Sequence, residues 1–518
     1  MSTSFNASQR DLMEYTDPGN AGPSGQPAKD RAPVAIKTLL DNLQRGSRAL
    51  ASRRSLLILA ELAASRALGV YLVGGSVREL ARGGETPDLD LAVSAQTLEL
   101  ARDLATALGG TYVLLDEAAA AARVVWHDEI LDLAEFRAPT LQGDLQGRDF
   151  TLNALAVELN AVLGRAPLEL IDPLGGLPDL SRGVLRMVAP ENFRADPLRL
   201  LRAYRFAATH GFQITPETSA SIRRTVAEFP RVAGERVHQE LFLLLKAPAA
   251  APVLEAMEAV GLLAQVFPEL EDMKGVEQNG FHHLDVFGHS MAAVAGLEEV
   301  LAAPGAYFGE MAAEVERYAR THPKAALLKL AALFHDAGKP RVRDRRTDPD
   351  RYTFYYHEKV GLEIFSQVAA RLRCSQAETK TVTTLIRVHM RPFLLLPAFR
   401  ERELSFRALG RLVRAARPEL AGLFALAMAD SLAGQGELKP PDSEAVLGDL
   451  ADEAYRFLKE RLEPQERYPK LISGHDLIRL GLEPGPRFRQ LLSAVEEAQW
   501  EGMIRTRQQA LEMVQRLR

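Results

Sequence analysis

Two aspartates separated by a single residue could together hold a metal ion. Asp88 and Asp90 lie in an apolar run typical of a strand, where residues two apart point to the same face. Mg²⁺ prefers a few carboxylates together with phosphate oxygens of a substrate. Asp132, in a later strand-like run, is the candidate third carboxylate. Such a set could activate a hydroxyl and stabilise a leaving pyrophosphate, although a lone D-x-D is also common in exposed turns.

A pair of glycines precedes these aspartates and makes a functional role for the D-x-D motif easier to identify. Gly74 and Gly75 follow the strand-like run 70–73 and precede Ser76 and Arg78. Paired glycines after a strand let backbone N–H groups approach phosphate oxygens, and the dipole of a following helix favours the anion. The two features together predict a site for a nucleoside triphosphate and Mg²⁺.

A second set of residues, far along the chain, has the order His, His-Asp, Asp. Imidazoles and carboxylates suit a divalent metal, and adjacent ligands on two helices make a compact cage. The proposed ligands are His289, His335, Asp336 and Asp430. His357 and His389 would allow a second ion. A lone histidine is often an ordinary core or surface residue, and this alternative stays open for His282, His283 and His389.

The elements that must position these residues change character along the chain. Between about 50 and 165, β-rich runs at 70–73, 89–93, 123–126 and 130–133 alternate with a helical segment near 96–108. After the Gly/Pro turn at 172–176, apolar residues recur with the helical period almost to the end. The sequence therefore predicts an α/β head followed by mostly all-α domains.

Breaks in composition suggest five segments. Residues 1–31 are rich in Ser, Asn, Gly, Pro and Gln, which predicts a disordered tail. Further breaks fall at 247–252 and 434–446. The remaining segments are a head at 50–178, a helical neck at 179–246, a metal-binding domain at 253–440 and a helical tail at 441–518.

Bulk properties exclude some classes of protein. The 518 residues exceed what one core supports, so several domains are expected. No apolar run approaches the roughly 20 residues that span a bilayer, so no membrane partner is expected. The single cysteine, Cys374, suits a reducing, cytoplasmic location. The net charge of −5 gives no global basic excess, but 182–246 holds eleven Lys/Arg against six Asp/Glu, which suits phosphates or a solvated helix face.

The G-G-S-V-R and D-L-D block resembles the polymerase-β-like head of class II tRNA nucleotidyltransferases, the CCA-adding enzymes, and of bacterial poly(A) polymerases. The segment 147–156, G-R-D-F-T-L-N-A-L-A, is similar to the family element that lies against the ribose of the incoming nucleotide. The resemblance implies nucleotide contacts for Arg148, Asp149 and Asn153. The segment 171–180 is similar to the family's hinge between head and neck.

The segment 193–206 is similar to the family motif in which protein side chains replace a nucleic-acid template. It implies that Asp196 and Arg199 offer a hydrogen-bonding edge to C or A. Arg137, Arg202 and Arg205 join the expected nucleotide-binding set. Asp196 could equally be a helix N-cap with Pro197 at the first helical position. The sequence departs from the family at Glu79, usually Asp, and at Ala195, usually Glu.

A shortened connection bears on specificity. Full CCA-adding enzymes carry a long flexible segment between the F-R strand end and the R-D-F element, whereas here only 138–147 separate Arg137 from Arg148. This resembles the CC-adding subgroup, which adds two cytidines from CTP. Full CCA addition, A addition from ATP, and poly(A) polymerase activity remain alternatives.

The histidine and aspartate set resembles HD phosphohydrolases, which implies a divalent metal and hydrolysis of a phosphomonoester or 2′,3′-cyclic phosphate at an RNA end. The tail resembles the closing segment of CCA-adding enzymes with HD domains, which implies contacts with the acceptor and TΨC arms of tRNA. Rivals from other classes are a phosphohydrolase whose head only binds RNA, and a noncatalytic RNA chaperone.

Overall fold

The structure is a computed structural model that describes residues 33–347, 350–466, 470–500 and 502–517. The predicted disordered tail, 1–31, lies outside the described residues. The chain divides into two compact units. The boundary between them along the chain falls between Arg231 and Val232, inside the predicted neck segment. Each unit is therefore described by itself.

The first unit is built on a mixed six-stranded sheet, with the strand order β3-β4-β5-β2-β1-β6. The strands are β1 (Val70–Val73), β2 (Asp88–Val93), β3 (Thr111–Asp116), β4 (Ala121–Trp126), β5 (Glu129–Glu135) and β6 (Ala156–Glu158). Only the β2–β5 pair is parallel; the other pairs are antiparallel. A short parallel pair, β7 (Val184–Leu185) and β8 (Gln213–Ile214), lies further along this unit.

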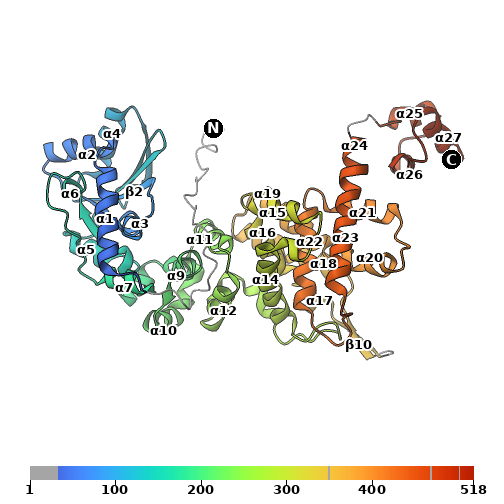
Figure 1. The fold of residues 1–518 in the computed structure, drawn as a ribbon, viewed down its shortest axis with the longest axis horizontal. Coiled ribbons are helices and arrows are strands. Elements are labelled where there is room, and N and C mark those ends of the chain that lie inside the picture. The colour runs from blue at the N-terminus through green and yellow to red at the C-terminus, as the bar shows by residue number, and fades with distance from the viewer. Residues whose placement is uncertain (1–32, 348–349, 467–469, 501, 518) are drawn as a thin grey trace, which may run out of the picture. The chain divides into compact units, whose positions relative to one another are not determined.

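Helices surround this sheet, in the blue and teal part of Figure 1. Further helices follow the sheet along the chain and complete the first unit. Together they are α1 (Ile36–Leu50), α2 (Arg54–Ser65), α3 (Gly74–Arg82), α4 (Thr97–Leu108), α5 (Leu141–Gln146), α6 (Leu159–Val162), α7 (Gly176–Arg182), α8 (Pro190–Ala195), α9 (Leu198–His210) and α10 (Pro216–Thr225), with 3₁₀ turns η4 (Thr151–Asn153) and η5 (Val226–Arg231). The predicted strand-like runs fall in β1, β2, β4 and β5. Sequence reasoning missed β3 and β6.

Helix α1 lies before the predicted start of the head, yet it belongs to the first unit. Its Leu39, Leu43 and Leu50 are buried, and the Asn42 side chain donates to the backbone oxygen of Ala81 at the end of α3, at 3.0 Å. These apolar positions recur with the helical period, so one stripe of α1 packs onto α3. The helix that carries the diglycine is thereby covered on its outer side.

The second unit is almost entirely helical. Its elements are α11 (Gly234–Lys246), α12 (Ala251–Ala259), α13 (Leu262–Val266), η6 (Pro268–Met273), α14 (Val286–Ala302), η7 (Pro304–Ala306), α15 (Ala312–Arg320), α16 (Lys324–Phe334), α17 (Lys339–Val342), β9 (Asp344–Thr347), β10 (Asp350–Thr353), α18 (His357–Arg371), α19 (Gln376–Val388), α20 (Arg391–Arg400), α21 (Phe406–Ala416), α22 (Leu420–Ala433), α23 (Ser443–Arg456), η8 (Phe457–Leu462), α24 (Glu463–Glu466), α25 (Gly474–Arg479), α26 (Pro486–Trp500) and α27 (Arg507–Leu517). The predicted fold class, an α/β head followed by mostly helical domains, is confirmed.

Helix α22 forms the centre of this unit. Its residues 420–431 and 433 are buried, so it is apolar all round, as expected for a helix enclosed by others. It packs against α14, α15, α16 and α23. Asp430 is the one acidic residue on this buried helix, and an ionised carboxylate in such a place needs hydrogen bonds or a cation.

The last three helices have a small core of their own, which includes Leu477, Leu491, Val495 and Val514. Among the described residues, no helix combines the length and apolarity that a bilayer crossing requires.

Candidate functional sites

Three carboxylates come together on the central strands of the sheet. The parallel pairing of β2 with β5 places Asp90 directly opposite Asp132. Leu89 and Leu91 are buried on one face, so Asp88 and Asp90 share the other. Ser76 fixes this strand, because its Oγ accepts the Asp90 N–H at 2.7 Å and donates to the Asp88 backbone oxygen at 3.3 Å.

These carboxylates raise one another's affinity for positive charge. Burial and the charge of Asp132 raise the pKa of Asp90 above its ordinary value. Burial likewise raises the pKa of Asp88, and the charge of Asp132 adds to that shift while Arg123 opposes it. Carboxylates whose ionised forms are disfavoured in this way are stabilised by a bound cation. The donor set, oxygen only, fits Mg²⁺.

Arg123 on β4 contacts the third carboxylate, a partner that sequence reasoning missed. Its Nε lies 2.7 Å from Asp132 Oδ1 and its Nη2 lies 2.9 Å from Oδ2. The register of β4 with β5 puts these two residues opposite each other. The alternation of side chains along the two strands was therefore the sequence signal that could have predicted this ion pair. Asp132 is a paired carboxylate, unlike Asp88 and Asp90.

The diglycine lies against the Asp90 carboxylate. Gly74 has φ +60°, which favours glycine, and it opens helix α3 directly after β1. A Cβ at Gly75 would lie 2.9 Å from Asp90 Oδ2. The absence of side chains at this turn therefore keeps the space beside the carboxylate open, at the N-terminus of a helix where an anion is favoured.

A chain of polar contacts joins the glycine turn to the neck helix α9. Arg78 donates to the side-chain oxygen of Asn153, and Asn153 Nδ2 donates to Asp149 Oδ1 at 2.9 Å. Arg202 donates from Nε to Asp149 Oδ2 at 2.9 Å. Burial opposes ionisation of Asp149, but the Arg202 charge and these hydrogen bonds outweigh it and lower the pKa of its carboxyl.

Asp144 positions Arg148, a role that the sequence did not reveal. Its Oδ2 accepts from Arg148 Nη2 at 3.0 Å and Nε at 3.2 Å, while its Oδ1 accepts the Arg137 N–H at 3.2 Å. Arg148 Nη1 lies 2.8 Å from where a Gly74 Cβ would be. The buried Asp144 thus joins the end of β5 to the turn beside the acidic pair.

The expected base-reading residues lie at the start of α9. Asp196 Oδ1 accepts the Leu198 N–H at 3.3 Å, and the N-cap of α9 is Pro197, one residue after the position that the sequence left open for Asp196. Arg199 Nη1 donates to the Asn192 backbone oxygen at 3.2 Å, and burial lowers the pKa of Arg199. The Arg205 guanidinium lies 3.8 Å from the centre of the Phe206 ring.

Six ligand-type residues form two buried groups in the second unit: His289, His335 and Asp430, and Asp336, His357 and His389. In three of the histidines, Nδ1 lies within hydrogen-bond distance of the backbone oxygen three residues earlier, at 2.8 Å for His335 and His357 and 2.7 Å for His389. A donor at Nδ1 leaves Nε2 with a lone pair. This tautomer is the one that binds a metal through Nε2.

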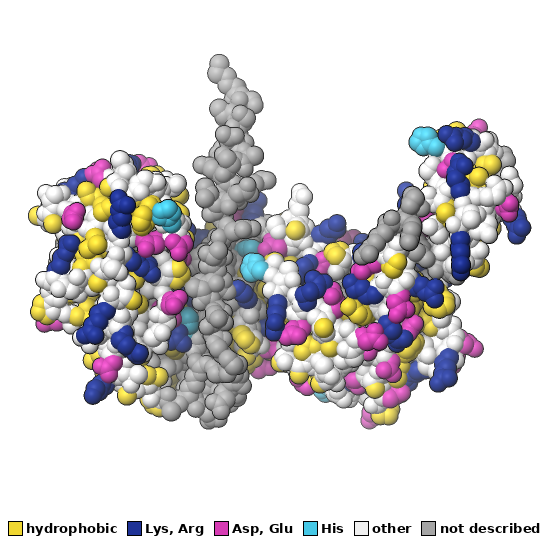
Figure 2. Space-filling view, turned by 45° about the horizontal axis from the view of Figure 1, so that its top comes forward, with side chains coloured by type: hydrophobic (Ala, Val, Ile, Leu, Met, Phe, Trp, Pro, Cys, Tyr) yellow, Lys and Arg dark blue, Asp and Glu magenta, His cyan; other side chains and the backbone are white. Residues whose placement is uncertain are grey.

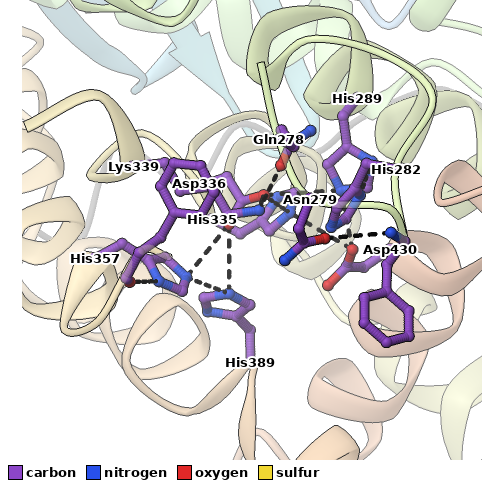
Figure 3. A network of polar contacts seen from close by, with 12 residues as sticks. Gln278, Asn279, His282, His289, His335, Asp336, Lys339, His357, His389 and Asp430 are labelled. Carbon is purple, nitrogen blue, oxygen red and sulfur yellow. Dashed lines mark hydrogen bonds and ion pairs between the residues drawn. The ribbon is translucent and has the colours of Figure 1, made fainter. Parts of the chain in front are cut away.

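Asp336 belongs to the second group and also reaches the first, and Figure 3 shows His357 and His389 on one side of it and His289 and Asp430 on the other. Its Oδ2 is 3.2 Å from His335 Nε2, and its Oδ1 is 3.3 Å from His357 Nε2. Both Asp336 oxygens and His335 Nε2 are buried and make no hydrogen bond of good geometry. A carboxylate that reaches histidines of both groups, beside a buried His335 Nε2 without a hydrogen bond, fits a site for two divalent ions.

Two neighbours of this cluster tune its charge. Lys339 Nζ lies 2.5 Å from Asp336 Oδ2 and 2.6 Å from Gln278 Oε1. His282 Nδ1 lies 3.3 Å from His289 Nδ1, and burial and the positive charge of Lys339 lower the pKa of His282 to about 3. His282 is therefore a neutral partner of His289, while His283 is outside both groups.

Comparison with known proteins assigns the parts of the chain to families. Residues 70–186 match the Poly A polymerase head domain, 211–274 match the probable RNA and SrmB-binding site of polymerase A, and 286–435 match the HD domain. The acidic site lies in the first match, and the buried histidines lie in the third.

The fold and these family matches define a nucleotidyltransferase with a fused HD domain. The chain is 38% identical to the A-adding tRNA nucleotidyltransferase of Deinococcus radiodurans, over 86% of this chain and 95% of that protein. It is 34% identical to the CC-adding tRNA nucleotidyltransferase of Thermus thermophilus, over 85% and 92%. The chain belongs to the tRNA nucleotidyltransferase family.

Solved structures share the fold. The Thermotoga maritima CCA-adding enzyme complexed with tRNA superimposes with a TM-score of 0.58 at 21% identity, covering 92% of this chain and 97% of that one. A CCA-adding enzyme with CTP gives a TM-score of 0.59 at 22% identity, with the same two coverages.

Proposed function

We propose that this tRNA nucleotidyltransferase adds the two cytidines of the CCA end, and the short connection between β5 and α5 carries the proposal. Strand β5 ends at Glu135 and helix α5 begins at Leu141. Thr140 caps that helix by accepting the Gly143 N–H at 3.2 Å, and Asp144 holds the Arg137 N–H. The connection has no spare length to rearrange the pocket for adenine after the second cytidine.

In the proposed reaction, the tRNA 3′ oxygen attacks the α-phosphorus of CTP. The new ester bond forms as the α–β anhydride bond breaks, pyrophosphate leaves, and the hydroxyl proton passes to solvent. Asp88 and Asp90 would hold Mg²⁺, which lowers the energy of the developing charge when bound. Asp132, which forms an ion pair with Arg123, would add to the negative electrostatic potential of the site.

The other contacts divide by the part of CTP that they face. The α3 N-terminus, with Gly74, Gly75, Ser76 and Arg78, would take the phosphates. Arg148, Asp149 and Asn153 would contact the ribose, supported by the hydrogen bonds that fix Asp149. Asp196 and Arg199 would read the base, with Arg137, Arg202 and Arg205 around them. Burial of the Arg199 guanidinium supports this role, since base-reading donors gain strength away from water.

The test uses two tRNA substrates, one lacking the whole 3′ end and one ending in CC. With CTP and ATP together, the first should gain two residues and stop, and the second should gain none. Incorporation of a single A on the CC-ended tRNA would overturn the proposal. Asp90→Asn serves as the inactive control for both substrates.

A second candidate is A addition to a tRNA that already ends in CC. The observation that favours it is the 38% identity to the A-adding relative, against 34% for the CC-adding relative. The same two substrates separate these candidates, because an A-adding enzyme would extend only the CC-ended tRNA, and only with ATP.

For the HD domain we propose a phosphohydrolase that acts on a phosphomonoester or 2′,3′-cyclic phosphate at an RNA end. Its metal ligands would be His289, His335, Asp336, His357, His389 and Asp430. Asp336→Asn should lower the bound divalent metal and remove hydrolysis, while C addition continues. Asp272→Asn, an exposed acid in η6, is the matched control. A hydrolytic rate unchanged by Asp336→Asn would overturn this assignment.

We also propose that the acceptor and TΨC arms of tRNA contact the helical neck and tail. The face drawn in Figure 2 shows Lys and Arg mixed with Asp and Glu, not gathered in one field. Recognition of the tRNA backbone by shape fits such a surface better than one large basic patch. The proposed domain limits remain 50–178, 179–246, 253–440 and 441–518.

A further inference from the structure

We infer that His238, Cys374 and Glu378 form a third metal site, which takes a soft divalent ion of the zinc type and is separate from the head and HD sites. The three residues come from two parts of the second unit. His238 lies in α11, Cys374 lies in the turn before α19, and Glu378 lies in the first turn of α19. Their ligand atoms all lie within 4.8 Å of one another.

The distance between His238 and Glu378 fits two ligands of one ion better than a hydrogen bond. Nε2 of His238 lies 3.4 Å from Oε1 of Glu378, and Nε2 is buried without a hydrogen-bond partner of good geometry. Ligands at zinc distances of about 2.0–2.1 Å, separated by a tetrahedral angle, lie roughly 3.3 Å apart. The unsatisfied nitrogen is the second observation, beside the cluster itself, that points to a cation.

The surroundings suit a bound ion with one open position. Glu378 accepts the Ser375 N–H through Oε2 at 2.6 Å, so its Oε1 is left for the ion. Cys374 also lines a hollow of about 430 Å³, which gives solvent access to the thiol.

The ligand types select the ion. Thiolate and imidazole prefer zinc and its soft relatives over Mg²⁺, which the head takes with oxygens alone. Sulfur binds a metal as the thiolate, so thiolate formation on addition of metal is a measurable sign of binding.

The test uses the full-length protein, stripped of metal by a chelator and titrated with Cd²⁺ or Co²⁺. Because Cys374 is the sole cysteine of the sequence, a sulfur-to-metal charge-transfer band reports this site alone. One thiolate per chain should coordinate. Cys374→Ser should abolish the band and leave the metal content of the HD site unchanged.

Glu378→Gln keeps the helix cap, since Gln also completes a capping box, but removes the charge and should weaken binding at least ~10-fold. His238→Ala should do the same, whereas His475→Ala, an exposed histidine in α25, should have no effect. Circular dichroism checks that each variant is folded. Absence of the band in the wild-type chain, or a band that both Glu378→Gln and His238→Ala leave unchanged, would overturn the inference.

Discussion

The guanidinium of Arg202 contacts one carboxylate oxygen of Asp149 from two nitrogens, at 2.9 Å from Nε and 2.8 Å from Nη2. Asp149 lies between helix α5 and the 3₁₀ turn η4, and Arg202 belongs to helix α9. The ion pair therefore joins the expected ribose-binding segment to the expected base-reading helix. Asp149 is buried, so water cannot take the place of Arg202 beside its carboxylate.

Replacing Arg202 by Met should destabilise the first unit by about 3 kcal/mol, because it leaves a buried carboxylate unpaired. The depressed pKa of Asp149 contributes stability above its unfolded pKa of about 3.9, and this contribution is lost as pH falls toward the folded value. The difference between wild type and Arg202→Met should thus be full at pH 7 and shrink below about pH 4. Urea unfolding at several pH values measures it.

Arg194 provides the matched control, because its side chain is 62% exposed and its ion pair with Glu191 spans 4.0 Å. Arg194→Met should change the free energy of unfolding by less than about 0.5 kcal/mol. Equal losses of unfolding free energy in the two variants would show that the Arg202–Asp149 pair stabilises the protein no more than an exposed ion pair does.

Replacing Asp90 by Asn should separate activity from stability. Nucleotide transfer should fall by about 10³-fold, since a group that stabilises developing charge is lost. The metal-free protein should become more stable, because the raised pKa of Asp90 marks a carboxylate that is unfavourable when ionised. Transfer kinetics and thermal unfolding in a chelator test both parts. Asp128→Asn, on the exposed β4–β5 turn, should alter neither, and a fully active Asp90→Asn would refute the assignment.

Replacing Gly75 by Ala should impair catalysis more than folding. The new methyl would lie 2.9 Å from Asp90 Oδ2, so the carboxylate must move. Displacement of a reacting group by a fraction of an ångström should lower kcat by up to about 10²-fold. Gly84→Ala is the control, because its nearest contact would be an ordinary 3.5 Å. Steady-state kinetics with CTP decide, and the same kcat in both variants would argue against this role for the diglycine.

Replacing Gly338 by Ala should damage the HD site selectively. Its Cβ would lie 2.0 Å from the backbone oxygen of His357, so α18 must shift, at a cost of about 1–3 kcal/mol. Metal content of the second unit should fall while nucleotide transfer by the first persists. Gly305→Ala, where a Cβ meets open space, controls for the change of residue. Retained metal and stability in Gly338→Ala would contradict the expectation.

Local pattern predicted much of the first unit. The runs at 70–73 and 89–93 became β1 and β2, because apolar residues bounded by Gly, Pro and Asp favour short strands. Strand β3 was missed because Val113, Leu114 and Leu115 are all exposed and show no alternation. The packing of α1 onto α3 was missed because nothing local tells a helix which partner will cover its apolar stripe.

By itself, the sequence determined the chemistry: two aspartates after paired glycines, the His-Asp pair and its order relative to the other histidines, and an α/β segment followed by helices. Only the tertiary structure decided that Arg123 pairs with Asp132, that Asp144 holds Arg148, and that Asp336 contacts histidines of both metal-ligand groups. The reason is physical. Residue type and spacing fix what a side chain is able to do, whereas its partners depend on strand register and helix packing between segments far apart in the chain.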